Sequence, residues 1–465
     1  MNSARVYQRR ALWMPLACLL AGMGMAAAQA TPNYSDSCTS VCIPFVSDPN
    51  QQPPPHPFTD APMLRIAVGD GKPTPVTMDT GSVGIAVPAG HIHPYQPTGQ
   101  CGSEFLSSSN LLWLGHWVHQ TVTFYDNHGD QVATACVPVL GVEQEWTCPE
   151  LKAGKATIST TSRCQVTGCQ SGPRKKNGLY MGVGFGRQGD FQPQGTPDKN
   201  ALLNLATITI NGQQAQVAHF NPGYIIGSAG ITVGLTKTNT AGFNFIRLSS
   251  YKDCPPQTAS GCPKVQYPEP SDWTAPSICV QTSGSSCPSD DGQGSDDSCC
   301  KAGGASGTLL VDTGIDYSFL TVPWTLSSEC QLNPCNPKSP CNPKTGCQPN
   351  SCNPKNPNPC NPGTGCPNIV KMLPPDSSSV VVNVATHPEP QSVELIPQPT
   401  QGRQPSQPCY VSPNPPNTPA FVNTGRHFLR QYQFLYDAQH GYVGLQQQSN
   451  AQCPPPVTTC PIPVP

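Results

Sequence analysis

The sequence has little charge and few aromatic residues. Only 11% of its 465 residues are charged and 7% are aromatic, whereas charged residues make up about 25% of an average globular chain. Long exposed helices and coiled coils need charged faces, so we do not expect them here. The formal net charge of −2 gives the protein no general attraction for nucleic acid or for an anionic membrane surface.

Two further signals are missing. After residue 30 the sequence contains no apolar run long enough to span a membrane. No serine lies in a Gly-x-Ser-x-Gly motif, the pattern of one large class of hydrolases with a serine nucleophile. The sequence therefore predicts neither a membrane span in the mature chain nor a serine hydrolase of that class.

Proline, glycine and cysteine are abundant, with 56, 42 and 24 residues. So many cysteines favour an oxidising compartment, where disulfides persist. Thirteen of the 24 cysteines lie in residues 252–301 and 330–370. The second of these segments is a degenerate Cys-Asn-Pro repeat that we expect to form loops held by disulfides, because proline removes backbone donors. Residues 388–420 are also rich in proline and are expected to form an extended surface loop.

The first 30 residues have the pattern of a cleaved signal peptide. Arg5, Arg9 and Arg10 precede an apolar stretch from Ala11 to Ala28, which ends in the small-x-small sequence Ala28-Gln29-Ala30. A membrane anchor is the alternative, but a proline and several glycines interrupt the stretch. We expect an exported protein, periplasmic or extracellular, whose mature chain keeps 23 cysteines, an odd number. Cys38 and Cys42 are expected to form a local disulfide.

The remaining pattern is that of short strands, and helical periodicity is confined to Phe428–Tyr432. Asp126–Gly129 has the composition of a hairpin turn. We expect an all-β protein with strands at Met63–Val68, Val76–Met78, Ile85–Val87, Thr121–Tyr125, Val132–Leu140, Leu203–Ile210, Ile225–Leu235 and Phe243–Leu248.

A duplicated tripeptide carries the chemistry. An apolar strand ends in Asp79-Thr80-Gly81-Ser82, and a second one ends in Asp312-Thr313-Gly314, 233 residues later. Each aspartate precedes a glycine that permits a tight turn. If the two loops face each other, the carboxyl groups lie about 3 Å apart and share one proton. One aspartate then acts as a general base on a water while the other polarises a carbonyl.

With these two motifs the sequence resembles the pepsin-like aspartic proteases. The segments Arg65–Pro88 and Gly307–Pro323 are similar to the two active-site strands and loops of that family. Asn177–Phe185 is similar to the strand that completes the first ψ-shaped loop, and Gly425–Leu445 to the C-terminal segment.

The resemblance implies an all-β, bilobal double-ψ barrel fold and an endopeptidase with Asp79 and Asp312 as catalytic residues. Thr80, Gly81, Ser82, Thr313 and Gly314 would support the pair. It implies a monomer that holds a protein or peptide substrate between two lobes, without a metal or cofactor. The cysteine spacings match no zinc-ligand pattern. The expected segments are 1–30 signal peptide, 31–62 Pro-rich segment, 63–200 N-terminal lobe, 201–446 C-terminal lobe with insertions 252–301 and 330–370, and 447–465 tail.

The sequence departs from the family pattern at several positions. Ile315 replaces the hydroxyl residue after the second motif, so Asp312 is expected to lose a donor and the pH optimum to be less acidic. Ala86 stands where the family has tryptophan, and Gly102–Trp117, where the substrate flap should lie, contains no tyrosine. Asn423-Thr424 replace the apolar residues expected before the glycine of the second ψ-loop.

The segment between Thr31 and Leu64 has no lysine or arginine, so we expect no basic propeptide of the family's type. The departures leave one alternative open, a catalytically inactive pepsin-fold protein with a binding or cell-surface role. Survival of both aspartates favours the active enzyme.

Overall fold

The fold comes from a computed structural model of the whole chain. The structure describes residues 32–46, 58–93, 95–97, 101–159, 164–173, 178–251, 267–282, 305–315, 318–322, 380–384, 391–395, 408–413, 419–449 and 452–457. The predicted signal peptide and the Cys-Asn-Pro repeat lie outside the described residues.

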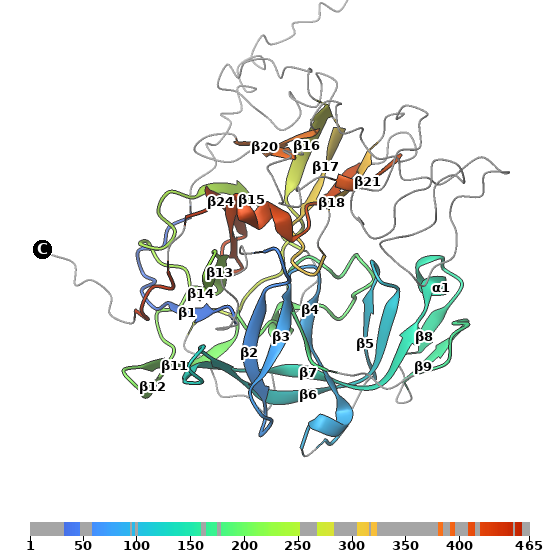
Figure 1. Ribbon diagram of the computed structural model, residues 1–465, viewed down its shortest axis with the longest axis horizontal. Helices are drawn as coiled ribbons and strands as arrows, with labels where there is room; N and C mark the ends of the chain where they lie inside the picture. The colour runs from blue at the N-terminus through green and yellow to red at the C-terminus, as the bar shows by residue number, and fades with distance from the viewer. Residues whose placement is uncertain are drawn as a thin grey trace, which may run out of the picture.

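A nine-stranded sheet forms the first lobe, in the order β12-β11-β7-β4-β10-β3-β2-β6-β5. Its blue-to-green strands fill the lower half of Figure 1. The strands are β2 (Met63–Val68), β3 (Thr74–Asp79), β4 (Val83–Pro88), β5 (Cys101–Leu106), β6 (Leu111–Tyr125), β7 (Gln131–Thr147), β10 (Tyr180–Val183), β11 (Leu205–Ile210) and β12 (Gln213–Gln216). Strands β11 and β12 follow the expected lobe limit at residue 200, so this sheet extends to Gln216.

A seven-stranded sheet forms the second lobe, in the order β20-β19-β16-β17-β22-β18-β21. Its labelled strands lie in the upper half of Figure 1. They are β16 (Ser277–Thr282), β17 (Ala305–Leu310), β18 (Ser318–Val322), β19 (Val380–Val384), β20 (Gln391–Leu395), β21 (Pro408–Pro413) and β22 (Ala420–Asn423).

The same ψ-shaped arrangement occurs once in each lobe. Strand β10 lies between β3 and β4, parallel to β3 and antiparallel to β4. Strand β22 lies between β17 and β18 in the same two orientations. The loops that join β3 to β4 and β17 to β18 carry the two Asp-Thr-Gly motifs. This arrangement confirms the predicted all-β bilobal fold class.

A six-stranded sheet in the order β1-β14-β13-β23-β24-β15 contains strands from distant parts of the chain. Its strands are β1 (Val41–Pro44), β13 (Gly223–Ile226), β14 (Gly230–Val233), β15 (Asn244–Arg247), β23 (Tyr432–Asp437) and β24 (Tyr442–Gln447). Strand β1 pairs with β14, and Cys42 is bonded to Cys453. The segment around β1 is thus an integral part of the fold.

The remaining elements are short. Strands β8 (Thr157–Ser159) and β9 (Gln165–Thr167) pair with each other, and the helices are α1 (Pro149–Lys152), η1 (Ala89–His91), η2 (Pro197–Lys199) and η3 (Arg426–Arg430). Helix η3 is the short helix expected near Phe428. One apolar core extends through the three large sheets and includes Met78, Tyr224 and Val422. Within the described part of the chain, no helix is both long and apolar enough to cross a membrane.

Several predictions of local structure need correction. The Cys38–Cys42 disulfide is wrong, because Cys42 pairs with Cys453, and Cys38 has another disulfide partner. The Pro-rich stretch 388–420 contains strands β20 and β21, which lie at the two edges of the second sheet. Edge strands tolerate proline because one of their sides needs no ladder donors. Ser277–Thr282, inside the expected insertion 252–301, forms a strand within the same sheet.

Candidate active site

Asp79 is the last residue of β3, at the point where the strand gives way to a tight turn. Its side chain is 4% exposed. The backbone N–H of Gly81 donates to Oδ1 of Asp79 at 2.7 Å, and the hydroxyl of Ser82 donates to Oδ2 at 2.7 Å. The predicted support from Ser82 is therefore present in the structure.

Asp312 follows β17 in the second lobe and is 6% exposed. The N–H of Gly314 donates to its Oδ1 at 2.9 Å, as Gly81 does for Asp79. The side chain of Asp79 lies within hydrogen-bonding reach of Asp312. The two motifs thus bring both predicted catalytic carboxyl groups together, although 233 residues separate them in sequence.

The two glycines permit this approach. A Cβ atom on Gly81 would lie 2.7 Å from Cγ of Asp312, and one on Gly314 would lie 2.5 Å from Oδ1 of Asp79. Real Cβ atoms do not approach other atoms this closely. Each loop therefore needs glycine because the carboxyl group of the opposite loop occupies the space of a side chain.

The two threonines join the loops by reciprocal hydrogen bonds. The N–H of Thr80 donates to Oγ1 of Thr313 at 3.0 Å, and the N–H of Thr313 donates to Oγ1 of Thr80 at 3.0 Å. The Thr313 hydroxyl donates to the carbonyl of Met78 at 2.7 Å, and the Thr80 hydroxyl to that of Val311 at 2.5 Å. This buried network fixes the two carboxyl groups relative to each other.

Asn423 is a site residue that the sequence analysis did not assign. It is the last residue of β22, 2% exposed, and its Nδ2 donates to Oδ2 of Asp312 at 2.8 Å. Ile315 offers no hydroxyl to Asp312, as expected, but an amide from the neighbouring ψ-loop strand donates to Oδ2 in its place. The sequence does show Asn423 as a polar residue in an apolar strand. Local sequence does not show which carboxylate the Asn423 side chain contacts.

The surroundings of Asp312 raise its pKa. The pKa of Asp312 is raised from its ordinary 3.8 to about 7. Burial is the largest cause, and the charge of the neighbouring Asp79 carboxylate is the next largest. The Asn423 amide acts in the opposite direction because it donates to the ionised form. A pair of this kind holds one proton over a wide pH range. The pKa of Asp312 is thus raised, as the sequence predicts, and burial is the main cause; a less acidic pH optimum stays a prediction.

An aromatic pair lies beside Asp79, where the family pattern of the flap is missing. Tyr180, the first residue of β10, donates its hydroxyl to Oδ2 of Asp79. Its ring packs edge-on against Trp113 of β6, with centroids 4.9 Å apart. Tyr180 pairs with Ala86 in the sheet, and Ala86 and Trp113 belong to the same apolar cluster. The small Ala86 side chain leaves room for these two rings.

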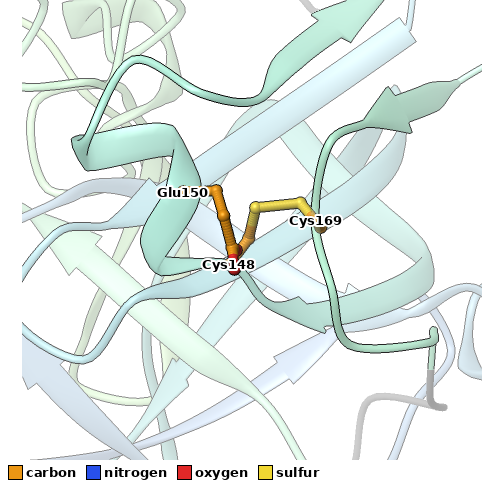
Figure 2. A group of neighbouring side chains, drawn as sticks. All are labelled: Cys148, Glu150 and Cys169. Atoms are coloured by element: carbon orange, nitrogen blue, oxygen red, sulfur yellow. A yellow bond between two sulfur atoms is a disulfide. The ribbon is translucent and has the colours of Figure 1, made fainter.

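Cys148, Glu150 and Cys169 are close enough together to suggest a metal site (Figure 2). The two sulfur atoms are bonded to each other as a disulfide, so they offer no thiolate to an ion. The disulfide joins the residue before α1 to Cys169.

No family model and no curated protein matches the sequence. Among solved structures, the chain is similar to an aspartic proteinase from Irpex lacteus. The match covers 88% of this chain and 98% of that one, with 11% sequence identity and a TM-score of 0.39. We therefore base the function on the geometry of this chain.

Proposed function

We propose that the protein is an exported aspartic endopeptidase that hydrolyses peptide bonds with a water activated by Asp79 and Asp312. The observation that carries the proposal is the pairing of two buried carboxyl groups by two symmetrically related loops. Burying two acids side by side is costly unless they share a proton. Structural stability alone does not call for such a pair, whereas peptide hydrolysis uses it directly.

The geometry supports a division of roles. In the proposed division the shared proton lies on Asp312, whose pKa is raised by burial and by the neighbouring carboxylate. Asp79, which accepts hydrogen bonds from Gly81 and Ser82, is then the ionised partner. In the proposed reaction Asp79 accepts a proton from the water as the water oxygen attacks the peptide carbonyl. Asp312 donates its proton to the carbonyl oxygen, which gives a tetrahedral diol. The C–N bond then breaks as the proton on Asp79 passes to the leaving nitrogen, and a diol hydroxyl returns a proton to Asp312 as the carboxylic acid forms.

The substrate is expected to be an extended protein or peptide chain held between the two lobes, and the enzyme to act as a monomer without a metal or cofactor. The disulfides Cys42–Cys453, Cys101–Cys164 and Cys148–Cys169 are compatible with export.

The proposal is tested by digestion of casein and of a peptide library from pH 3 to pH 8. We expect cleavage that pepstatin inhibits, that is lost in Asp79→Asn, and that declines as pH rises through about 7 because Asp312 loses its proton. Asp126→Asn, in the β6–β7 turn, is the matched control with full activity. Cleavage by Asp79→Asn at the wild-type rate would refute the proposal, and absence of cleavage by a folded wild type would favour a pepsin-fold binding protein.

A further inference from the structure

Tyr180 and Asn423 occupy equivalent positions in the two ψ-loops. In the first lobe Gly182 of β10 pairs with Asp79, and Tyr180 lies two residues before that glycine. In the second lobe Asn423 pairs with Leu310, and it lies two residues before Gly425. Each of these two side chains donates to Oδ2 of the aspartate in its own lobe. The two ψ-loop strands thus supply one polar donor to each carboxyl group.

The Tyr180 hydroxyl lies in a defined network. It donates to Oδ2 of Asp79, the oxygen that also accepts from Ser82, and the two hydroxyl oxygens are 3.1 Å apart. Its pKa is raised well above the ordinary value by burial and by the charge of Asp79. The phenol therefore stays protonated, and remains a donor, over the whole range in which the acid pair titrates.

The ring of Tyr180 is held from the other side by the β5–β6 hairpin. Trp113 of β6 packs against it, and the Trp113 indole N–H donates to Glu145 of β7 at 2.8 Å. Trp113 is 2% exposed. This packing fixes the direction of the Tyr180 hydroxyl, so the donor is positioned before any substrate binds.

We propose that Tyr180 is a positioning residue of this site, whose hydroxyl stabilises the Asp79 carboxylate through a hydrogen bond to Oδ2. The effect of Tyr180 on catalysis rests on the proposed function, whereas its effect on the titration of the acid pair does not. Asp79 would then have three donors, Gly81, Ser82 and Tyr180, against the two donors of Asp312, Gly314 and Asn423.

Other groups face this pair and act on the same titration. The charge of Glu104 in β5 raises the pKa of Tyr180, and the charge of Asp79 raises the pKa of Tyr224 in β13. Arg187, in the loop after β10, lowers the pKa of Asp312. These groups remain in place when the Tyr180 hydroxyl is removed, so a change in the titration of a Tyr180→Phe variant reports the hydroxyl itself.

The test is a pH titration of the acid pair in the full chain, in which NMR of 13C-carboxyl-labelled aspartate is the readout. Asp79→Asn and Asp312→Asn variants assign the signals. In Tyr180→Phe we expect the more acidic step of the pair to rise by roughly one pH unit, since a donor to the ionised form is lost. Tyr267→Phe is the matched control, because Tyr267 is a buried tyrosine whose hydroxyl donates to the backbone carbonyl of Leu205 at 2.6 Å. It should leave the titration unchanged.

An unchanged acidic step in Tyr180→Phe would overturn the inference, whether or not the wild type cleaves peptides. A shifted step in a protein that cleaves no peptide would support the electrostatic role and refute the proposed function instead. If the protein is active, the acid limb of its kcat profile should move by the same amount in Tyr180→Phe. Tyr180→Met is a second variant that removes the hydroxyl without placing a phenyl ring at this position. The same shift is expected, because both variants lose the hydroxyl donor.

Discussion

The Asn423 amide donates to Oδ2 of Asp312 over 2.8 Å, from a strand that lies between β17 and β18. The other end of the same amide accepts the N–H of Gly425 at 3.0 Å. Asn423 therefore orients a hydrogen bond to the acid pair through its own bond to the backbone. It performs for Asp312 the donor function that Ser82 performs for Asp79.

Removing this amide is expected to change the pH profile. Because the Asn423 amide lowers the pKa of Asp312, Asn423→Leu should raise that pKa further and move the alkaline limb of activity upward by roughly half to one pH unit. The measurement is kcat/KM against pH. The variant should also lower Tm, since the Gly425 N–H loses its acceptor. An alkaline limb that stays fixed, or moves toward acid, would contradict the assigned role.

The stability of the protein should depend on the charge of Asp312. Its pKa is about 7 in the folded chain and its ordinary value is 3.8. Between these values the folded state binds a proton that the unfolded chain has released, so stability falls as pH rises through this window. We expect the wild-type Tm to fall by a few degrees between pH 4 and pH 7. In Asp312→Asn this fall should be smaller, because the titrating group is gone.

His440 contributes in the same direction and must be separated from this effect. Its hydrogen bond to Asp437 raises its pKa, so its stabilising charge is fully present below pH 6.5 and is lost as pH rises through the raised value. Comparison with Asp312→Asn isolates the acid pair, since His440 is unchanged there. A wild-type Tm that rises from pH 4 to pH 7, or an equal slope in the variant, would refute the assignment.

The cross-bonded threonines should be essential to stability. Thr80→Val removes the acceptor of the Thr313 N–H and the donor to the Val311 carbonyl, and leaves both groups buried. The expected cost is roughly 2–4 kcal/mol, from one to two kcal/mol for each unsatisfied group. Denaturant unfolding measures it. Thr80→Ser keeps both bonds and should lose less than about 1 kcal/mol; similar losses in the two variants would show that the hydroxyl is not responsible.

The two motif glycines should tolerate no side chain. In Gly81→Ala the new Cβ meets the carboxyl group of Asp312, and in Gly314→Ala it meets that of Asp79. Separation of the carboxyl groups is expected to lower kcat/KM by at least about 100-fold. Gly90→Ala is the control, because a Cβ at Gly90 meets nothing within 4 Å. Retention of wild-type kcat/KM in either motif variant would show that close approach of the acids is not needed.

The sequence predicts the centre of the site because the motif is local. Each aspartate, its glycine and the preceding apolar strand are contiguous, and Met63–Val68 is predicted with the limits that the structure has. Tyr180 and Asn423 were not predicted as site residues, because they reach the aspartates only through the ψ-loop pairings of β10 and β22. Such contacts depend on strand order, which local patterns do not encode.

Composition misled the interpretation elsewhere. Strand β16 lies in a Cys-rich stretch, and β20 and β21 lie in a Pro-rich stretch, so their short apolar patterns were hidden by residues typical of loops. The Cys42–Cys453 disulfide joins residues 411 positions apart, and spacing alone favoured the nearer pair.

The central claim is that Asp79 and Asp312 act as one unit on one water. The most direct test is kcat/KM for a peptide that the wild type cleaves, measured for Asp79→Asn, Asp312→Asn and the double variant. Residues that act as a unit are strongly non-additive. We expect each single substitution to lower kcat/KM by about 1,000-fold or more. The kcat/KM of the double variant should be no lower than that of the less active single variant. Independent losses that multiply, or a single variant that keeps wild-type activity, would contradict the claim.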